Sequence, residues 1–474
     1  MSDEFTISES GKVLENANLI KKYHGNLVYD YTEYPTKGIW TEKFGHDEYK
    51  NAICDWFPKN KTAPVLFYVH TPFCEQLCNF CLCSKEITRD YEKVKDYLYN
   101  YLAKEIDLLE DHLINNKINF NFKEIYFGGG SPTYYRDEEF KFLINRLKKF
   151  INFKDLGDFT IEVDPRRVDE EKLVFYHEMG LNRLSFGIQD FDPGVQEEIN
   201  RHQPSSLLDK LMTPRIRKLF PVINFDLLIG LPRQNVNTIS NTIKEVVRLK
   251  PSQLQTMYVH YKPGTRKYMI KMVRNEPMLD FFDRKAVFQK ASEILIKSGY
   301  ERAGFESYAL PTDPLAKSMH EKKAVYNSLG TQKGAAINFI AVGSSAHGVL
   351  NEQYYFQNYY EQDLYKKALD QGKFPIYRGL KMTPDDVIRR EVIRHIRTFF
   401  NIEFDFFEKK YPYKFQNYFE KELKNLKVME CDGLLNIKEK NIVLTPLGEH
   451  FSPQIANVFD IYNDQEFYKR NLSL

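Results

Sequence analysis

Short apolar runs alternate with longer amphipathic stretches through the middle of the chain. Runs of four to eight residues rich in β-branched and aromatic side chains are typical of buried strands, and the stretches between them have the 3.6-residue period of helices. The predicted strands are Val65–Val69, Glu124–Phe127, Phe159–Val163, Arg183–Phe186, Val222–Leu228 and Gln253–His260. The clearest helices between them are Tyr91–Leu113, Asp137–Phe150, Glu170–Met179 and Asn237–Leu249. Six such β-then-α units predict an α/β fold with parallel crossovers.

Glycine, proline and charged residues collect just after the predicted strands, as in Gly128–Pro132, Asp164–Arg166 and Gly230–Pro232. In a (β/α) barrel this end carries the active site, because the loops that follow the strands converge over the barrel mouth. An open Rossmann sheet is the alternative, but no GxGxxG follows the first strand. The pattern therefore favours a partial TIM-type (β/α)6 barrel over residues 61–345.

The segments on both sides of the predicted barrel do not continue its alternation of strands and helices. Residues 1–60 predict a helix at Ser10–Tyr23 and an extended strap at Tyr29–Trp40. Residues 346–379 are expected to form a connecting segment. Residues 380–474 begin with a capped amphipathic helix, continue with a second helix at Tyr413–Lys427, and include a strand at Ile442–Thr445. This order resembles a winged helix, yet no basic recognition face stands out, so a packing or substrate-covering role is favoured over DNA binding.

Composition narrows the class of protein. The chain has 474 residues, of which 42% are hydrophobic and 28% charged, and its net charge is +2. These values are typical of a globular protein and give no reason to expect a nucleic-acid partner. No run of 18 or more apolar residues predicts a membrane span, and the polar amino terminus does not read as a secretory signal. Four of the six cysteines are clustered, and the six do not form a disulfide framework, which predicts a reducing, cytoplasmic location.

Four of the six cysteines fall within ten residues after the first predicted strand. Cys74, Cys78 and Cys81 have the spacing C-x3-C-x2-C, and Cys83 follows in C-x-C. Three thiolates in one loop predict a four-iron cluster with one iron left open for a small-molecule ligand. A zinc ion held by all four cysteines is the alternative, although a C-x-C pair closes a tetrahedron awkwardly. The position of the loop at the start of a barrel favours the catalytic cluster.

Several motifs, in order along nearly the whole chain, resemble those of one family. They are YTEYPT at 31–36, YVHTPFCEQLCNFCLC at 68–83, GGGSPT at 128–133, IEVDPR at 161–166, LSFGIQDF at 184–191, NRHQ at 200–203, DLLIGLP at 226–232 and RREVI at 389–393. The sequence is thereby identified as similar to radical S-adenosylmethionine (SAM) enzymes of the oxygen-independent coproporphyrinogen III oxidase family, as a divergent member.

The resemblance implies an oxidoreductase of porphyrin and haem metabolism. Its cofactors would be a [4Fe-4S] cluster and one or two SAM molecules, and reductive cleavage of SAM would give a 5′-deoxyadenosyl radical that attacks the propionates of a tetrapyrrole substrate. Electrons would come from a low-potential donor such as flavodoxin or ferredoxin. Carried over by position, Cys74, Cys78 and Cys81 would ligate the cluster. The SAM-binding and catalytic positions would be Tyr68, Phe80, Gly129, Gly130, Ser131, Glu162, Gln189, Arg201, Asp226, His260 and His347.

Four departures from the family pattern leave the reaction open. Asp30 stands where the family has an arginine suited to a propionate, and Leu329 replaces a glutamine. His260 and His347 replace apolar residues at SAM-contacting positions. Three interpretations remain: oxidative decarboxylation of coproporphyrinogen, another radical reaction on haem or a flat substrate (methyl transfer or anaerobic ring opening), and a haem chaperone without catalysis.

Overall fold

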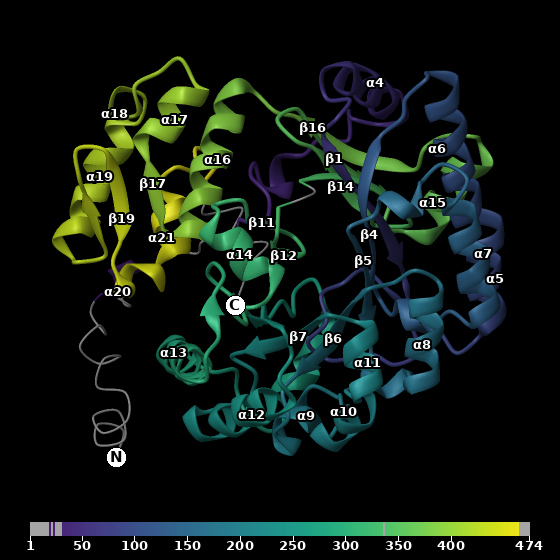
Figure 1. Ribbon diagram of the computed structural model, residues 1–474, viewed down its shortest axis with the longest axis horizontal. Coiled ribbons are helices and arrows are strands. Elements are labelled where there is room, and N and C mark those ends of the chain that lie inside the picture. Colours follow the sequence, from purple (N-terminus) through teal and green to yellow (C-terminus); the bar gives the residue numbers. More distant parts are fainter. Residues whose placement is uncertain (1–18, 20–21, 24–30, 335–336, 464–474) are drawn as a thin grey trace.

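A twelve-stranded sheet, most of it wrapped by helices, forms the centre of the molecule (Figure 1). The computed structural model describes residues 19, 22–23, 31–334 and 337–463. The strand order is β16-β15-β14-β13-β1-β4-β5-β6-β7-β8-β10-β9, so the two edge strands are β16 and β9 and the sheet does not close. The fold is a curved, partial barrel.

Six parallel strands at the middle of this sheet correspond to the six predicted ones. They are β1 (Pro64–Thr71), β4 (Asn121–Gly129), β5 (Asp158–Val163), β6 (Arg183–Gln189), β7 (Val222–Ile229) and β8 (Gln253–Tyr258). Each pairs in parallel with the next along this order. The predicted α/β class and the parallel crossovers are confirmed. The last strand ends at Tyr258, so His260 lies in the loop beyond it.

Helices on the outer face separate consecutive parallel strands (Figure 1). They include α6 (Ala103–Asn115), α7 (Asp137–Leu147), α8 (Glu170–Glu178) and α12 (Val236–Leu249), and α13 (Phe281–Lys297) follows the last of these strands. The predicted helix Tyr91–Leu113 is divided, since α5 (Tyr91–Asp96) passes through a π-helical turn, Tyr97–Leu102, before α6 begins. Apolar side chains of the strands and helices form the main core between these two layers.

The carboxyl-terminal half of the barrel extends the sheet beyond the prediction. Strand β13 (Asn338–Val342) pairs in parallel with β1, and β14 (His347–Leu350), β15 (Tyr354–Asn358) and β16 (Ile376–Lys381) continue antiparallel from it. Residues 346–379, expected as a connecting segment, therefore supply strands of the central sheet and helix α15 (Gln362–Asp370). At the other edge, β10 (Ser307–Ala309) pairs antiparallel with β8, and β9 (Glu301–Arg302) pairs antiparallel with β10. The hairpin of β11 (Val325–Asn327) and β12 (Gly330–Gln332) follows helix α14 (Pro314–His320).

The strap connects the sheet to the carboxyl-terminal domain. Of the predicted Tyr29–Trp40 segment, residues 31–40 are described, and the predicted helix Ser10–Tyr23 lies almost wholly outside the described residues, as does Asp30. Tyr31 and Tyr34 are buried in the core of the carboxyl-terminal domain. Trp40 stacks on Tyr355 of β15 with ring centroids 4.8 Å apart. A helix not predicted from the sequence, α4 (His46–Trp56), follows the strap.

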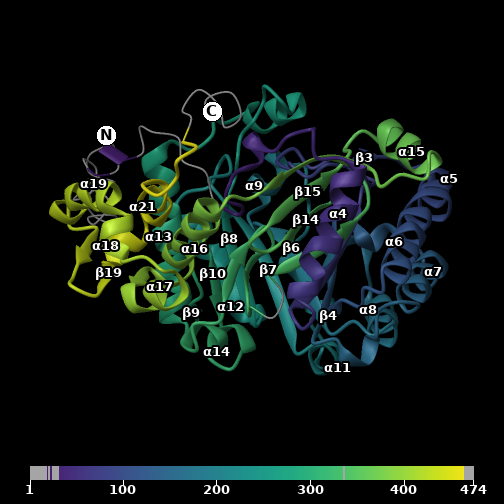
Figure 2. The same ribbon diagram turned by 90° about the horizontal axis from the view of Figure 1, so that it is seen from above.

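The carboxyl-terminal domain has its own hydrophobic core and lies to one side of the barrel in both views (Figures 1 and 2). It consists of α16 (Pro384–Phe399), α17 (Phe404–Lys410), α18 (Phe415–Tyr418), α19 (Glu420–Cys431), α20 (Pro446–Glu449) and α21 (Ser452–Asn457) around a three-stranded sheet. Its strands are β17 (Asn401–Glu403), β18 (Leu435–Ile437) and β19 (Asn441–Leu444). None of the described helices is long and apolar enough to cross a bilayer.

The inner face of the barrel carries a buried carboxyl group. Glu124 on β4 is 4% exposed and lies near Asp158 on the adjacent strand β5. Burial, and after it the negative charge of Asp158, raises the pKa of Glu124 to about 7. A carboxyl group whose pKa is raised on folding stabilises the fold while it is protonated. This stabilisation is lost as the pH rises through about 7.

Glu124→Gln is expected to stabilise the protein at pH 8 by on the order of 1–3 kcal/mol, because the amide removes a buried charge. At pH 5 the native carboxyl group is protonated, so the variant and the wild type should then unfold alike. Urea unfolding of the apo-protein, followed by circular dichroism at both pH values, measures the difference. Glu439→Gln, at an exposed position, serves as the control. An equal effect of Glu124→Gln at both pH values would contradict the assignment.

Candidate active site

The three spaced cysteines lie on the loop that follows β1. After β1, the short strand β2 (Phe73–Cys74) pairs with β3 (Glu86–Ile87), and the loop between them carries Cys78, Cys81 and Cys83. His70 Nε2 donates a hydrogen bond to Ser84 O at 3.0 Å, and burial lowers the pKa of His70 to about 4. A neutral imidazole therefore ties the end of the loop back to β1.

Helix α9 (Pro193–Glu198) and the residues after it hold the middle of the loop. Asn79 Nδ2 donates to Glu198 O at 2.8 Å, and Asn200 Nδ2 donates to Leu77 O at 2.8 Å. These bonds bracket Cys78, which is buried, whereas Cys83 is exposed. The loop backbone is thus held on both sides of Cys78.

One cavity of about 610 Å³ collects most of the predicted site residues. Its lining includes Cys74, Cys78, Phe80, Cys81, Gly129, Gly130, Ser131, Glu162, Gln189, Arg201, Asp226 and His260. They come from the carboxyl ends of β1 and β4–β8 and from the loops that follow, the end of the barrel where the sequence places the active site. Cys83 also lines the cavity.

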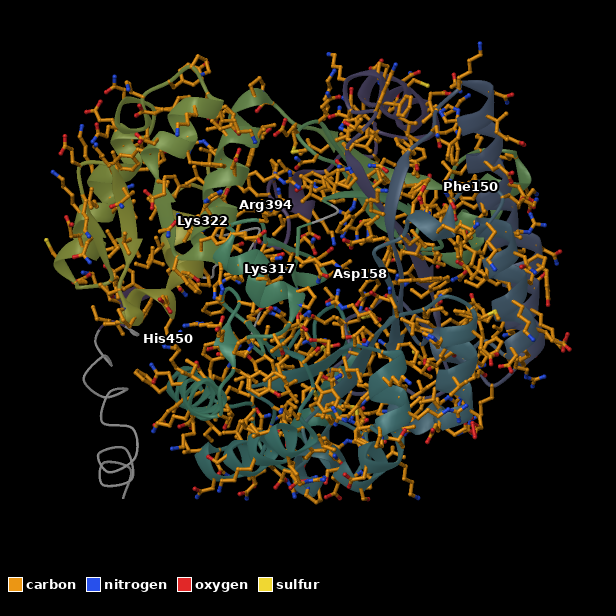
Figure 3. The ribbon with its side chains drawn as sticks, in the orientation of Figure 1. Phe150, Asp158, Lys317, Lys322, Arg394 and His450 are labelled. Atoms are coloured by element: carbon orange, nitrogen blue, oxygen red, sulfur yellow. The ribbon has the colours of Figure 1, made fainter. Side chains whose placement is uncertain are left out.

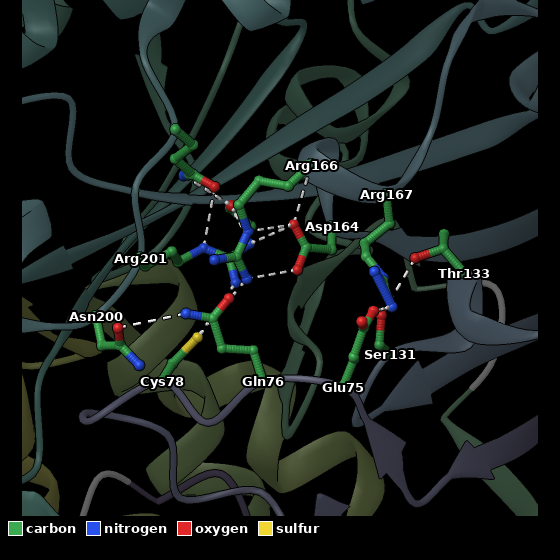
Figure 4. Close-up of polar contacts among 12 residues, drawn as sticks. Glu75, Gln76, Cys78, Ser131, Thr133, Asp164, Arg166, Arg167, Asn200 and Arg201 are labelled. Carbon is green, nitrogen blue, oxygen red and sulfur yellow. Dashed lines mark hydrogen bonds and ion pairs between the residues drawn. The ribbon is translucent and has the colours of Figure 1, made fainter. Parts of the chain in front are cut away.

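Two guanidinium groups point at the sulfur of Cys78 (Figure 4). Arg201 NH1 lies 3.6 Å and Arg166 NH2 3.9 Å from Cys78 Sγ. Both arginines also contact Asp164. Arg166 donates to its carboxylate from Nε at 2.9 Å and from Nη2 at 2.7 Å. Burial alone would raise the pKa of Asp164, but the two arginines hold it below its ordinary value. The Cys78 end of the cavity therefore carries positive charge suited to a thiolate.

Carboxyl and amide side chains line the wall above the cysteines. Glu162 on β5 accepts hydrogen bonds from Gly129 N at 3.0 Å and Tyr126 OH at 3.2 Å, and burial raises the pKa of Glu162 to about 8. Asp226 on β7 accepts from Ser185 Oγ at 2.9 Å, and burial raises its pKa as well. Gln189, in the left-handed region with φ of 68°, has a buried Oε1 with no hydrogen-bond partner among the described residues. Such an oxygen calls for a donor on a ligand.

The glycines at 128–130 are required by the protein's own packing. A Cβ on Gly128 would lie 2.8 Å from Glu162 Oε1, and one on Gly129, where φ is 109°, would lie 2.6 Å from the His70 ring. A Cβ on Gly130 would lie 2.7 Å from Phe73 O and 2.8 Å from Thr71 O. The triplet therefore lets the end of β4 lie directly against β1, the cysteine loop and the carboxyl group of Glu162.

Two predicted site residues lie outside the cavity lining. Tyr68 on β1 packs in a separate apolar cluster, and its hydroxyl lies 3.2 Å from His70 Nδ1. His347 on β14 instead contacts the strap: its Nε2 lies 3.2 Å from Glu33 Oε1 and 3.2 Å from Ser328 Oγ. Leu329, the apolar replacement for a glutamine, also packs in the apolar cluster of Tyr68 and not in the cavity.

Sequence reasoning missed several residues that line the cavity. Asp164 and Arg166 belong to the IEVDPR motif, and their position after a strand could have singled them out. Glu306, just before β10, and Tyr326 on β11 have no motif to reveal them; Tyr326 OH donates to Glu306 Oε2 at 3.3 Å. Only the fold brings these two to the wall that also carries Gln255 of β8.

The residues present fit an iron–sulfur cluster with SAM. Among the described residues, no three His, Cys, Asp or Glu side chains converge on a single-ion site, so the zinc alternative has no preformed tetrahedron. A four-iron cluster instead takes its cysteines at separate irons, and Cys74, Cys78 and Cys81 line the same cavity. The unpartnered Gln189 Oε1 and the positive charge at Cys78 complete a site for a polar, charged cofactor.

The comparisons with known proteins define the class. Residues 68–246 match the family model of the radical SAM superfamily, and residues 382–449 match that of the HemN C-terminal domain. The fold and this match make the chain a radical SAM protein, and its cofactors are a [4Fe-4S] cluster and SAM.

The relatives define the family within that class. The chain is 31% identical over 450 residues to the oxygen-independent coproporphyrinogen III oxidase of Pseudomonas aeruginosa, covering 94% of this chain and 96% of the relative. It is 31% identical over 451 residues to that of Escherichia coli, covering 94% and 95%. The solved structure of coproporphyrinogen III oxidase from Escherichia coli matches with a TM-score of 0.85 and 30% identity, over 94% of this chain and 98% of that one. The chain belongs to the oxygen-independent coproporphyrinogen III oxidase family.

Proposed function

We propose that the chain is a radical SAM oxidoreductase that oxidatively decarboxylates the propionate side chains of coproporphyrinogen III. The observation that carries the proposal is the single cavity that joins the three cysteines to a second, polar wall at Glu306 and Tyr326. Its volume of about 610 Å³ lies in the range of roughly 300–1,000 Å³ usual for sites that enclose a sizeable small molecule. The family relationship, which spans 94% of the chain, supports the same reaction.

The chain's own residues bind and orient the cofactors. Cys74, Cys78 and Cys81 would hold the cluster, and its open iron would take SAM. When bound, the cluster and SAM supply reductive cleavage of SAM and abstraction of a hydrogen atom from the substrate. Arg166 and Arg201 neutralise thiolate charge at Cys78, since their nitrogens lie within 4 Å of its sulfur.

The cavity wall offers partners for the polar groups of SAM. Glu162 and Asp226 present buried carboxyl groups as acceptors for hydroxyl groups, and Gln189 presents an unpartnered amide oxygen. Gly129 and Gly130 have no side chain, so their backbone lines the cavity beside these polar groups, and Ser131 lines it next to them. Phe80 lines the same wall with an apolar ring. Tyr68 and His347 act behind this wall, because they pack outside the cavity.

The partners follow from this reaction. A reductive cleavage needs a low-potential electron donor, and we assign flavodoxin or ferredoxin to this role. All six cysteines are free of disulfides, as a reducing cytoplasm requires. The winged-helix-like domain packs against the barrel through the strap and through contacts of α16 with β11, and none of its described residues lines the cavity.

The test is an anaerobic assay with the reconstituted protein, SAM and a strong reductant. Incubation with coproporphyrinogen III is expected to release carbon dioxide and 5′-deoxyadenosine together, with a matching loss of mass from the porphyrinogen. 5′-Deoxyadenosine without any mass change in coproporphyrinogen III would overturn the substrate assignment. Formation of 5′-deoxyadenosine alone, on the other hand, tests the radical SAM class.

A second candidate substrate rests on one residue. His260 lines the cavity, whereas a family enzyme has an apolar residue there, and imidazole is a ligand for haem iron. Haem incubated under the same conditions is the second arm of the assay. Ring opening or methylation of haem, with coproporphyrinogen III left intact, would favour a radical reaction on haem. Tight haem binding without product would favour a chaperone.

A further inference from the structure

A second cavity, of about 170 Å³, lies where the carboxyl-terminal domain meets the barrel. Helix α16, the strand β11 and the turn between β14 and β15 form its walls. It is separate from the active-site cavity: Val325 of β11 lines this one and the next residue, Tyr326, lines the other, as expected for neighbours on opposite faces of a strand. Figure 3 labels Lys322 and Arg394 at this junction.

The second cavity carries more positive than negative charge. Its cations are Lys322, Lys323, Arg390, Arg394 and Lys410, and its carboxylates are Glu352 and Glu391. Lys410 contacts both carboxylates, at 2.8 Å and 2.7 Å. Both carboxylates of the wall therefore form their ion pairs with Lys410, and neither forms one with an arginine.

Arg390 and Arg394, one helical turn apart on α16, converge on one neutral oxygen. Arg390 NH1 donates to Asn351 Oδ1, and Arg394 NH1 lies 3.5 Å from the same atom. Among the described residues, neither guanidinium group has a carboxylate within 4.0 Å, although Arg390 is only 5% exposed. Burial, and then the charge of Arg390, lowers the pKa of Arg394 to about 9. The two guanidinium groups are thus held together without a directly bonded carboxylate, and Glu352 and Glu391 offset the charge of Arg394 only from a greater distance.

Asn351 is fixed in place, so it cannot move away from the two arginines. Its backbone N–H donates to Asn338 Oδ1 at 2.9 Å, and its carbonyl oxygen accepts from Trp56 Nε1 at 3.2 Å. The arginines therefore converge on a rigid point at the wall of the cavity. A preorganised pair of guanidinium groups is the arrangement with which proteins bind oxyanions.

Thr398 adds an unused hydroxyl group to the same wall. It lies one turn beyond Arg394, is 1% exposed, and its Oγ1 has no hydrogen-bond partner among the described residues. A buried hydroxyl group without a partner destabilises the folded state unless a ligand or water satisfies it. The neighbouring His395 adds no charge at neutral pH, because burial lowers its pKa to about 4.

We propose that this second cavity binds a compact oxyanion with the chemistry of phosphate, held by Arg390, Arg394 and the hydroxyl of Thr398. A tetrahedral oxyanion can accept from both guanidinium groups and from the hydroxyl at once, and its negative charge offsets the excess of positive charge on the walls. Because the cavity adjoins the reverse side of β11, the bound anion would link α16 to the strand whose other face lines the active site. The site does not depend on the function proposed above.

The test measures binding of inorganic phosphate to the full-length protein with its cluster reconstituted and SAM at saturation, so that the cationic groups of the active site are occupied. Isothermal titration calorimetry at constant ionic strength should show one saturable site. Arg394→Gln is expected to weaken it at least tenfold, and the isosteric Thr398→Val severalfold. Arg248→Gln removes an arginine paired with Asp209 on a distant helix and should leave binding unchanged.

The binding measurements can overturn the proposal or identify the ligand. Equal binding to the wild type, Arg394→Gln and Thr398→Val, with all three folded by circular dichroism, would overturn the proposal, as would the absence of saturable binding. Stronger binding of citrate than of phosphate would overturn the phosphate assignment. Adenosine monophosphate gives the source: tighter binding than inorganic phosphate identifies a phosphate ester as the ligand, and weaker binding identifies the free anion.

Discussion

Cys78→Ala is expected to abolish both the iron–sulfur cluster and the formation of 5′-deoxyadenosine. Cys78 is the most buried of the three spaced cysteines, and two guanidinium groups lie within 4 Å of its sulfur. Removing this thiolate takes away one iron ligand, and it leaves Arg166 and Arg201 facing an apolar methyl group. Iron content, visible absorption after anaerobic reconstitution, and 5′-deoxyadenosine yield measure the loss, which should be complete.

Cys83→Ala is the matched control for this substitution. Cys83 lies on the same loop but is exposed, and the three-cysteine cluster does not require it. This variant should keep its iron and form 5′-deoxyadenosine. If Cys83→Ala and Cys78→Ala both lost the metal, and the wild-type protein bound zinc instead of iron, the four-cysteine zinc site would be correct instead. Circular dichroism of both apo-proteins checks that the fold survives.

The parallel strands could be predicted because their physical cause is local. A strand buried on both faces is usually a short apolar run. Val65–Val69 is such a run, and Val222–Leu228 is one apart from Asn224 and Asp226. Strands β14 to β16 belong to the same sheet, yet their sequences are mixed. Tyr354–Asn358 carries tyrosine, glutamine and asparagine, and it becomes a strand because β14 and β16 flank it. Pairing partners distant in the chain decided this part of the fold, and they leave no periodic pattern.

The residues of the candidate site also fall into two groups: those that local motifs predict and those that only the fold brings to the cavity. Cysteines within one loop, and glycines after one strand, are visible as local motifs, and the structure brings both to one cavity. Glu306 reaches that cavity only because β10 pairs antiparallel to β8. His347 shows the reverse case, since its place in the family pattern predicts a cofactor contact. The fold gives it a carboxylate instead: burial alone would raise the pKa of Glu33, but Lys37 and His347 hold it well below its ordinary value.

Gly130→Ala is expected to reduce both the cluster content and the rate of SAM cleavage at least about tenfold. For the rate, this factor corresponds to roughly 1.4 kcal/mol. The added Cβ would lie 2.7 Å from Phe73 O and 2.8 Å from Thr71 O, both rigid backbone atoms. Those carbonyl oxygens already accept hydrogen bonds from Ser131 N at 2.8 Å and Gly130 N at 2.6 Å. The clash therefore has to separate β4 from β2, and β2 carries Cys74, the first of the predicted cluster ligands.

The free energy of unfolding of Gly130→Ala should also fall, by about 1–3 kcal/mol, because overpacking displaces backbone in a well-packed region. Gly157→Ala is the control, since its Cβ would meet nothing closer than Lys123 O at 3.7 Å. It should leave cluster content and cleavage unchanged. Measuring iron content, SAM affinity and urea unfolding for both variants separates two physical reasons for a glycine at position 130. If Gly130→Ala bound its full cluster and lost only SAM affinity, the glycine would serve the cofactor's approach and not the contact between β4 and the cysteine loop.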